Sequence, residues 1–197
     1  RTNESIESLD HKFIKIDVTK DSLDPSLLPD SLDGLVYCPG SINLRPFRGL
    51  KPETFVEDFN LNVMGAIKTI SAVLKNLNNA DHSSIVLFST VAVQTGMPFH
   101  SSIAVSKGAI EGLTRSLAAE LAPKVSINAI APSLVNTPLA EKFLNSESKM
   151  ERAMDRHPLK KVGSPEELAN IAVYLLLNSS WITGQIIGVD GGIGTLK

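Results

Sequence analysis

The sequence has little cysteine and no long apolar run. Cys38 is the single cysteine among 197 residues, which excludes an internal disulfide framework and is typical of a protein of the reducing cytoplasm. No run approaches the roughly 18 consecutive apolar residues that a membrane-spanning helix needs. No signal peptide is visible either. The sequence therefore predicts a cytoplasmic protein without a membrane segment.

An excess of charge of one sign is also missing. Lysine and arginine number 19 against 21 aspartates and glutamates, which gives a net charge of -2. This balance excludes a strongly basic nucleic-acid-binding protein, and no nucleic-acid partner is expected. Apolar residues make up 43% and charged residues 20%, as in a soluble globular protein. With no internal repeat, linker or low-complexity segment, residues 1–197 are predicted to form one domain.

Short β-rich runs alternate with longer helical patterns along the chain. The predicted strands span residues 13–18, 34–38, 84–89, 125–130 and 185–189. Their nearly unbroken apolar character is typical of strands covered on both faces. Apolar spacings of three and four predict helices over 52–77 and 102–121. Such alternation predicts an α/β protein with a mostly parallel sheet flanked by helices.

A third helix is predicted after Ser164, because Ser164 is a good N-cap, Pro165 suits the first helical position and Glu167 completes a capping box. The preceding stretch, residues 138–157, is more polar and follows the fourth predicted strand. It is either a substrate lid or a plain surface helix, and the sequence favours neither.

Five stretches together carry a resemblance to the short-chain dehydrogenase/reductase family. They are PLKKVGSPEELA at 158–169, ITGQ at 182–185, VDGG at 189–192, SKGA at 106–109 and NAIAPS at 128–133. The resemblance runs over nearly the whole chain, in order. It implies a Rossmann-type, doubly wound parallel sheet in three layers. It also implies an oxidoreductase that moves a hydride between NADP or NAD and a small carbonyl or alcohol, without a metal.

The Gly-rich turn that holds a pyrophosphate after the first strand of a dinucleotide-binding fold is not found near the start of the sequence. Compared with the family, the N-terminal β-α-β portion is absent. In the expected strand order 3-2-1-4-5-6, the absent strands would lie between 13–18 and 34–38 and leave unpaired edges. We therefore expect that the chain is a fragment of a longer protein; a degenerate gene product is the alternative.

The resemblance assigns three of the four catalytic roles in the family. Lys107 matches the lysine that lowers the pKa of the acid and binds the nicotinamide ribose. Thr90 stands at the position of the serine that holds the substrate oxygen, with Ser89 as a second candidate. Asn62 matches the asparagine that supports a relay water. The tyrosine that donates the proton should lie four residues before Lys107, where this sequence has Ile103.

Another proton donor is one way to fill the missing role. His100 lies seven residues before Lys107, so two helical turns bring it back toward the same face, and the enoyl reductase branch of the family has its tyrosine at this spacing. The alternative, which we favour, is a loop histidine just before the helix. The only tyrosines are Tyr37, for which we expect a packing role, and Tyr174, expected in the core or an interface.

The resemblance also implies the contacts of the cofactor. The candidates are Asp17, Val18, Cys38, Pro39, Gly40, Lys107, Pro132, Ser133, Val135 and Thr137. Asp17 would lie near the adenine, and Thr137 near the carboxamide. Of the turn under the nicotinamide only Gly40 is identical to the family, and Pro39 lacks the N–H of the usual alanine. A basic residue at Arg1 gives a slight preference for NADP.

Small residues follow one side of the helix predicted over 102–121. They are Gly108, Gly112, Ser116 and Ala119. By resemblance and by two-fold symmetry they predict a homodimer or homotetramer; close packing onto the chain's own sheet is the alternative. Two hypotheses about function remain. One is an NAD(P)-dependent oxidoreductase, and the other is a non-catalytic relative that keeps the fold as a binding or oligomeric subunit.

Overall fold

The computed structural model of the protein describes residues 11–196, and its centre is a parallel sheet. The strands are β1 (Gly34–Val36), β2 (Ser83–Phe88), β3 (Val125–Pro132) and β4 (Ile186–Val189). They are hydrogen-bonded in the order β1-β2-β3-β4, and every pair is parallel. Four of the five predicted strands are therefore confirmed, with small shifts at their ends, and the α/β fold with a parallel sheet is confirmed as well.

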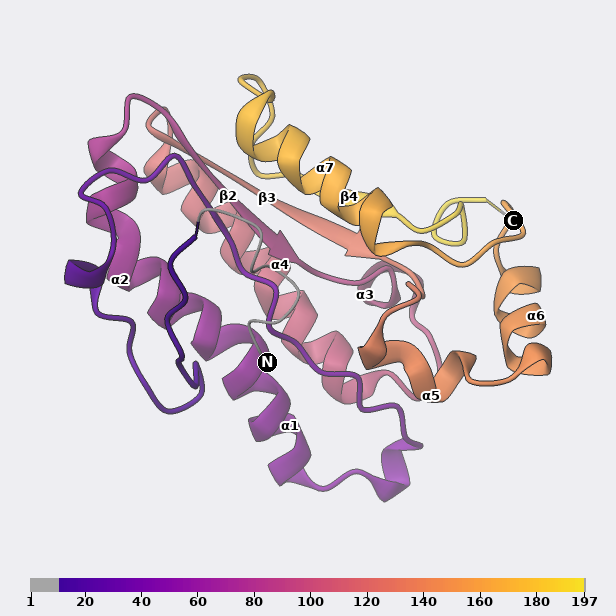
Figure 1. Ribbon diagram of the computed structural model, residues 1–197. Coiled ribbons are helices and arrows are strands. Elements are labelled where there is room, and N and C mark those ends of the chain that lie inside the picture. The colour runs from indigo at the N-terminus through magenta and orange to yellow at the C-terminus, as the bar shows by residue number, and fades with distance from the viewer. Residues whose placement is uncertain (1–10, 197) are drawn as a thin grey trace.

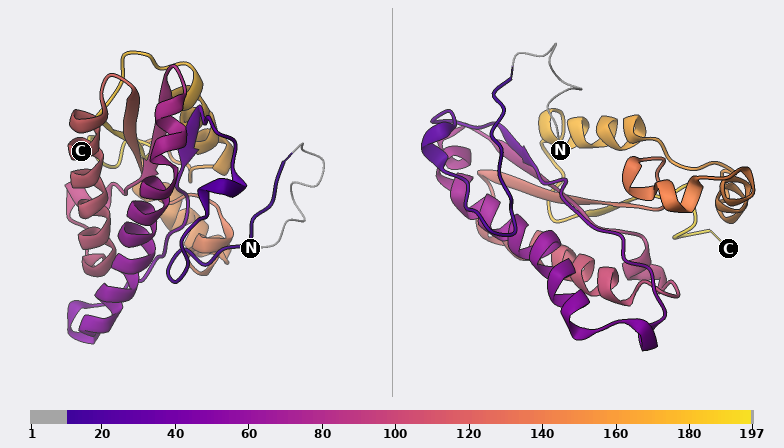
Figure 2. Two further views of the ribbon diagram at one scale, coloured as in Figure 1. Left: turned by 90° about the vertical axis from the view of Figure 1, so that its left-hand side faces the viewer. Right: turned by 60° about the horizontal axis from the view of Figure 1, so that its bottom comes forward.

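Helices cover both faces of this sheet (Figure 1). The helices that cover or extend the sheet are α1 (Pro52–Phe59), α2 (Gly65–Asn79), α3 (Ala92–Thr95), α4 (Ser101–Leu121) and α7 (Pro165–Leu177). The helices α2 and α4 lie on one face and α7 lies on the other, as the turned views in Figure 2 also show. The result is the three-layer arrangement that the sequence predicts.

The side chains of the central strands alternate between the two apolar layers. Ile85 and Leu87 of β2 pack into the cluster with α2 and α4, whereas Val86 packs against α7. In β3, Ile127 belongs to the first cluster and Ile130 to the second. Successive strand side chains point to opposite faces, so only a run that is apolar at every position satisfies both layers. This is why the predicted strands lack a polar alternation.

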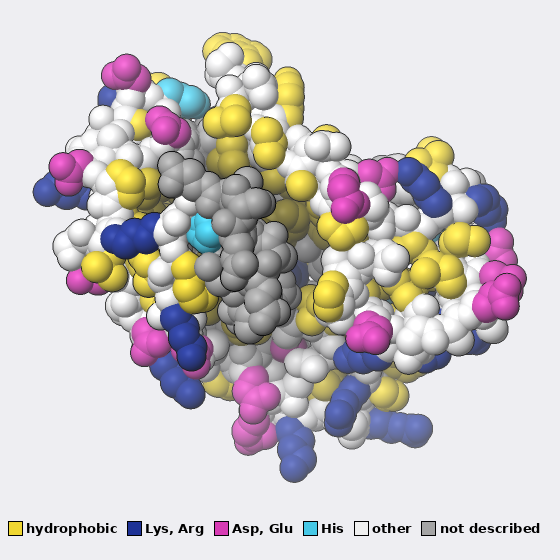
Figure 3. Space-filling view, in the orientation of Figure 1, with side chains coloured by type: hydrophobic (Ala, Val, Ile, Leu, Met, Phe, Trp, Pro, Cys, Tyr) yellow, Lys and Arg dark blue, Asp and Glu magenta, His cyan; other side chains and the backbone are white. Residues whose placement is uncertain are grey.

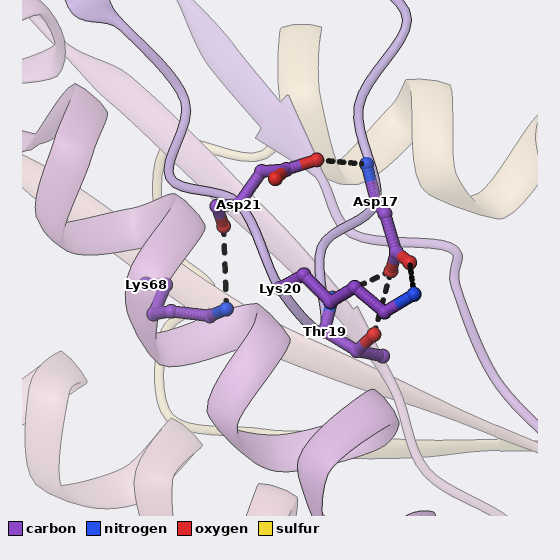
Figure 4. A network of polar contacts seen from close by, with 5 residues as sticks. All are labelled: Asp17, Thr19, Lys20, Asp21 and Lys68. Carbon is purple, nitrogen blue, oxygen red and sulfur yellow. Dashed lines mark hydrogen bonds and ion pairs between the residues drawn. The ribbon is translucent and has the colours of Figure 1, made fainter.

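The prediction of a strand at 13–18 is wrong. This segment has no strand pairing, and β1 is the edge of the described sheet. Asp17 instead begins a turn, because its carboxylate accepts hydrogen bonds from the backbone N–H and the hydroxyl of Thr19 and lies 3.5 Å from the Lys20 ammonium (Figure 4). A strand depends on hydrogen bonds to a neighbour, and among residues 11–196 no neighbouring strand is there to supply them.

Side chains of α2 hold the segment that precedes β1. Lys68 donates to the carbonyl of Asp21 at 3.2 Å (Figure 4). The side-chain amide of Asn76 donates to the carbonyl of Pro29, and the backbone carbonyl of Asn76 accepts from the N–H of Leu32. These bonds satisfy polar backbone groups that would otherwise pair within a sheet. The segment thus follows α2 in an irregular path.

The helix predicted over 52–77 is present but contains a wider turn. Between α1 and α2, the π-helical turn η3 (Asn60–Met64) places the N–H of Gly65 on the carbonyl of Asn60. The hydroxyl of Tyr37 donates to the nearby carbonyl of Leu61 at 2.6 Å. Tyr37 is buried, and burial raises its pKa to about 12. The expected packing role of Tyr37 is therefore confirmed.

The contact between Tyr37 and the π-helical turn leaves no space for a side chain at Gly65, so a substitution of Gly65 tests this contact. A Cβ at Gly65 would lie 2.1 Å from the hydroxyl oxygen of Tyr37, which is closer than atoms can approach. Gly65→Ala is expected to lower the free energy of unfolding by about 1–3 kcal/mol in urea denaturation, the usual cost of overpacking. Gly49→Ala is the control, since no atom lies within 4 Å of its Cβ and its φ is not positive, so it should change the free energy of unfolding by less than about 0.5 kcal/mol. Equal effects of the two substitutions would contradict the contact.

The predicted capping box is confirmed at the start of α7. Ser164 accepts from the N–H of Glu167, and the Glu167 carboxylate accepts from the N–H of Ser164. Before it, residues 138–157 form the short turn η4 (Pro138–Ala140) and the helices α5 (Glu141–Leu144) and α6 (Glu147–Arg156). These helices lie beyond the carboxyl end of β3 (Figure 1). Within residues 11–196, no helix is long and apolar enough to cross a membrane.

Candidate active site

Lys107 lies in the interior, on the face of α4 that packs against the sheet. Only 8% of the residue is exposed, and its ammonium donates to the carbonyl of Phe88 at the end of β2, at 2.8 Å. Burial lowers the pKa of Lys107 to about 8, while electrostatic interactions with Cys38 and Asp58 act in the opposite direction. An amine of this kind can change its charge near neutral pH, which is typical of functional lysines.

Asn62 lies in the π-helical turn η3 and is completely buried. Its Nδ2 donates to the carbonyl of Asp58 at 2.8 Å and to the hydroxyl of Ser41 at 3.0 Å. Its Oδ1 is buried without a hydrogen-bond partner. Turns of this type occur often at functional sites, and a buried acceptor without a partner costs free energy unless something donates to it.

Gly40 lies next to the side chains of both Asn62 and Lys107. A Cβ at this position would lie 3.3 Å from Oδ1 of Asn62 and 3.6 Å from Nζ of Lys107. The turn after β1 therefore lies directly against both functional side chains. A side chain at this position would fill the space next to Oδ1 of Asn62 and Nζ of Lys107.

The two hydroxyl candidates after β2 differ in their contacts. Ser89 is buried, and its Oγ donates to the carboxylate of Glu111 at 2.9 Å. Thr90 is half-buried; its hydroxyl accepts from the N–H of Ala92 at 3.3 Å and is 3.4 Å from the carbonyl of Pro132. The hydroxyl of Ser89 is thus committed to Glu111, whereas the two long contacts of Thr90 leave it the better candidate to meet a substrate.

The first turn of α4 carries no evident proton donor. Ile103 is 5% exposed and lies one helical turn before Lys107. The ring Nδ1 of His100, the N-cap residue of α4, is paired with the carbonyl of Pro98 at 2.7 Å, which supports the interpretation as a loop histidine. Ser102 donates to the carboxylate of Asp58.

The remaining cofactor candidates lie in three places. Cys38, Pro39 and Gly40 follow β1, and Pro132, Ser133, Val135 and Thr137 follow or end β3. At the end of β3, Ser133 is bonded to Nε2 of the buried His157 at 2.8 Å. Asp17 belongs to the exposed turn described above, and Val18 packs near Gly65 instead of ending a strand. Arg1 lies outside the described residues.

A hollow of about 500 Å³ adjoins Thr137 on the side of α5. Its lining residues are Asn136, Thr137, Pro138, Glu141, Leu144 and Asn145. Lys142 of α5 also donates to the carbonyl of Ile42, in the loop after β1, at 2.9 Å. Residues 138–157 therefore connect the loops that follow β1 and β3, as a lid would, although a surface helix can make the same contacts.

Sequence reasoning missed Asp58 and its partners. Asp58 is 1% exposed and accepts hydrogen bonds from Ser41, Asn43 and Ser102. One signal was available: Asp58 lies one turn before Asn62, and the residues three positions away on the same helical face are the apolar Phe55 and Leu61. A carboxylate at an inward-facing helical position is uncommon and points to a buried polar network.

Known proteins resemble this chain in sequence and in fold. Residues 1–194 match a family model described as enoyl-(acyl carrier protein) reductase. The relatives include a 3-oxoacyl-(acyl-carrier-protein) reductase from Thermotoga maritima, 36% identical over 146 residues, which are 73% of this chain and 58% of the relative. A 2,3-dihydroxy-2,3-dihydro-p-cumate dehydrogenase from Pseudomonas putida is 32% identical over 165 residues, which are 82% of this chain and 64% of the relative.

Solved structures show the same likeness. An aldohexose dehydrogenase from Thermoplasma acidophilum superposes with a TM-score of 0.84 at 26% identity, covering 94% of this chain and 79% of that one. ElxO with NADP bound also gives 0.84 at 26% identity, covering 92% and 77%. The fold and the matched residues define an α/β protein of the dehydrogenase class. The chain belongs to the short-chain dehydrogenase/reductase family.

The chain spans only part of the length of these relatives. It covers 58% of the Thermotoga reductase and 64% of the Pseudomonas dehydrogenase. The family model matches residues 1–194, which include α4 and the four strands of the described sheet.

Proposed function

We propose that the protein is an NAD(P)(H)-dependent oxidoreductase that reduces a small carbonyl compound or oxidises the corresponding alcohol. One observation carries this proposal: the buried ammonium of Lys107 lies beside Gly40 and the free oxygen of Asn62. A buried lysine with a lowered pKa and an unpartnered buried acceptor at one edge of a parallel sheet are features of a binding crevice. A purely structural helix needs neither.

The residues present fit part of a nicotinamide site. Gly40 keeps space next to Lys107, and Val135 and Thr137 follow the end of β3 as the family's carboxamide contacts do. Lys107 would bind the ribose hydroxyls, and Gly40 would allow the close approach. When bound, the cofactor supplies or accepts the hydride. NADP is preferred, since ElxO binds NADP.

The protein's own groups would then orient the substrate and move a proton. Thr90 would donate its hydroxyl hydrogen to the substrate oxygen, and the Lys107 ammonium would stabilise the negative charge that develops there. Ile103 has no transferable proton, so the proton that reduction adds to the oxygen would come from water or from His100. A tuned general acid typically contributes about 10²–10⁴-fold, and we expect slow turnover without one.

The second candidate function is a non-catalytic relative that binds a partner or another subunit. Ile103 in place of an acid favours it, and so does Pro39, which has no N–H to offer to a cofactor. Against it stands the joint presence of Lys107, Asn62 and Thr90. Both functions predict the same fold, and they differ in cofactor binding.

Titration of the full-length gene product with NADPH and NADH separates the two functions. We expect a saturable calorimetric isotherm, with a dissociation constant in the micromolar range typical of cofactor enzymes. Oxidation of the bound cofactor is then followed over a panel of ketones and aldehydes. No binding of either cofactor at millimolar concentrations would remove the oxidoreductase proposal.

We propose a homodimer or homotetramer as the assembly. Gly112, Ser116 and Ala119 on the outward side of α4 are exposed, so they do not pack on the chain's own sheet. Apolar side chains also gather over and beyond α7 (Figure 3). The exposed ones are Val173, Tyr174, Leu177 and Trp181. The exposure of Tyr174 excludes the core position and supports the alternative of an interface.

A further inference from the structure

Asp58 is a buried carboxylate for which the proposed reaction has no assigned role. Its Oδ1 accepts from the hydroxyl of Ser41 at 2.6 Å and from Nδ2 of Asn43 at 2.7 Å, and its Oδ2 accepts from Ser102. No ion pair within residues 11–196 includes it. Burying an ionised carboxylate costs several kcal/mol, and a neutral or apolar residue would fill the position at less cost. Packing alone therefore does not explain why a carboxylate occupies this position.

The hydrogen-bond directions in this network supply the reason. Ser41 has a single hydroxyl hydrogen, and it donates that hydrogen to Asp58. Its oxygen can then only accept from Asn62, so the neighbouring group of Asn62 must be the amide nitrogen. The backbone carbonyl of Asp58 is also an acceptor for the same nitrogen. A rotated Asn62 would place its oxygen against two acceptors, which is unfavourable.

One orientation of the amide remains. With Nδ2 held by Ser41 and by the Asp58 carbonyl, Oδ1 of Asn62 lies on the side of Gly40 and Lys107 and has no partner within the described chain. In addition, the bond from Ser102 ties the first turn of α4, the helix that carries Lys107, to α1. The carboxylate thus fixes both the acceptor and the helix that carries Lys107.

We propose that Asp58 is a positioning residue: through Ser41 it sets the direction of the Asn62 amide, so that Oδ1 is presented as a hydrogen-bond acceptor to whatever occupies the crevice beside Lys107. The occupant would need an O–H or N–H donor, such as a water molecule or a substrate hydroxyl. The catalytic consequence rests on the proposed function, whereas the orientation of Asn62 does not.

The test compares Asp58→Asn with Ser41→Ala and with Glu57→Gln. Asp58→Asn can donate to Ser41, which frees the serine hydrogen to point at Asn62 and allows the amide to rotate. Ser41→Ala removes the link but keeps the carboxylate, so it decides the matter if Asp58→Asn does not fold. Glu57→Gln removes the same charge from an exposed neighbour in α1 and is the matched control.

The readout is the side-chain amide of Asn62 in ¹⁵N-resolved NMR spectra. We expect shifted resonances and faster hydrogen exchange of this NH₂ in Asp58→Asn and Ser41→Ala, and wild-type spectra in Glu57→Gln. For an active enzyme, kcat should fall roughly 10- to 100-fold in the first two variants, with little change in the KM of the cofactor. An unchanged Asn62 amide in both variants would overturn the proposal. A changed amide without cofactor binding would support it and remove the proposed function instead.

Discussion

Ile103→Tyr is expected to raise the rate of NAD(P)H-dependent carbonyl reduction by about 10²–10⁴-fold, the usual contribution of a positioned general acid. Ile103 and Lys107 lie one helical turn apart in α4, and both are buried. Side chains at this spacing are neighbours. A phenol placed there would have the ammonium beside it, and a nearby cation lowers a tyrosine pKa toward neutral pH. The substitution therefore adds the one group that the site lacks.

Ile103→Phe is the matched control for this prediction. It has the same ring and the same fit in the first turn of α4 but no hydroxyl, so it should leave the rate at the level of the unchanged protein. Combining Ile103→Tyr with Lys107→Met should remove most of the gain, since the phenol then loses its cation. The measurement is kcat/KM for several aldehydes and ketones between pH 6 and 9. If tyrosine and phenylalanine give equal rates, the site lacks more than its acid.

Local patterns predicted much of the molecule. The three-four spacing predicted α4, and the residues Ser164 and Glu167 predicted the start of α7. These features depend on neighbours within one or two helical turns. Patterns of this kind are readable from sequence because every atom involved lies within a few residues.

Features that depend on distant partners could not be predicted in this way. Residues 13–18 have the alternation of a strand, with half-buried Ile14, Ile16 and Val18 between exposed residues, yet a strand requires a hydrogen-bonded neighbour. The direction of the Asn62 amide depends on Ser41, 21 residues away, and on the carboxylate of Asp58. No spacing in the sequence marks Ser41 as a partner of Asn62. Hydrogen-bond direction appears only once the segments are assembled.

Lys107 should also make the protein more stable as the pH rises through the range 7.5–9.5. Its pKa is about 8 when folded and 10.5 for the ordinary amine. Between these values the unfolded chain holds the proton that the folded chain has released. The unfolded chain therefore binds more protons, and the free energy of unfolding increases with pH. The full difference corresponds to about 3 kcal/mol, and about 2 kcal/mol of it should be gained between pH 7.5 and 9.5.

Comparison with Lys107→Met isolates this effect, because groups common to both proteins contribute equally. Urea unfolding at several pH values should give a rising curve for the unchanged protein and a flatter one for Lys107→Met. The range stops at pH 9.5 because Tyr37, whose pKa burial raises to about 12, acts with the opposite sign above pH 10. There the unfolded tyrosine loses its proton first and stability falls. Parallel curves for the two proteins would mean that the amine of Lys107 is hydrated, and the proposed active site would lose its central group.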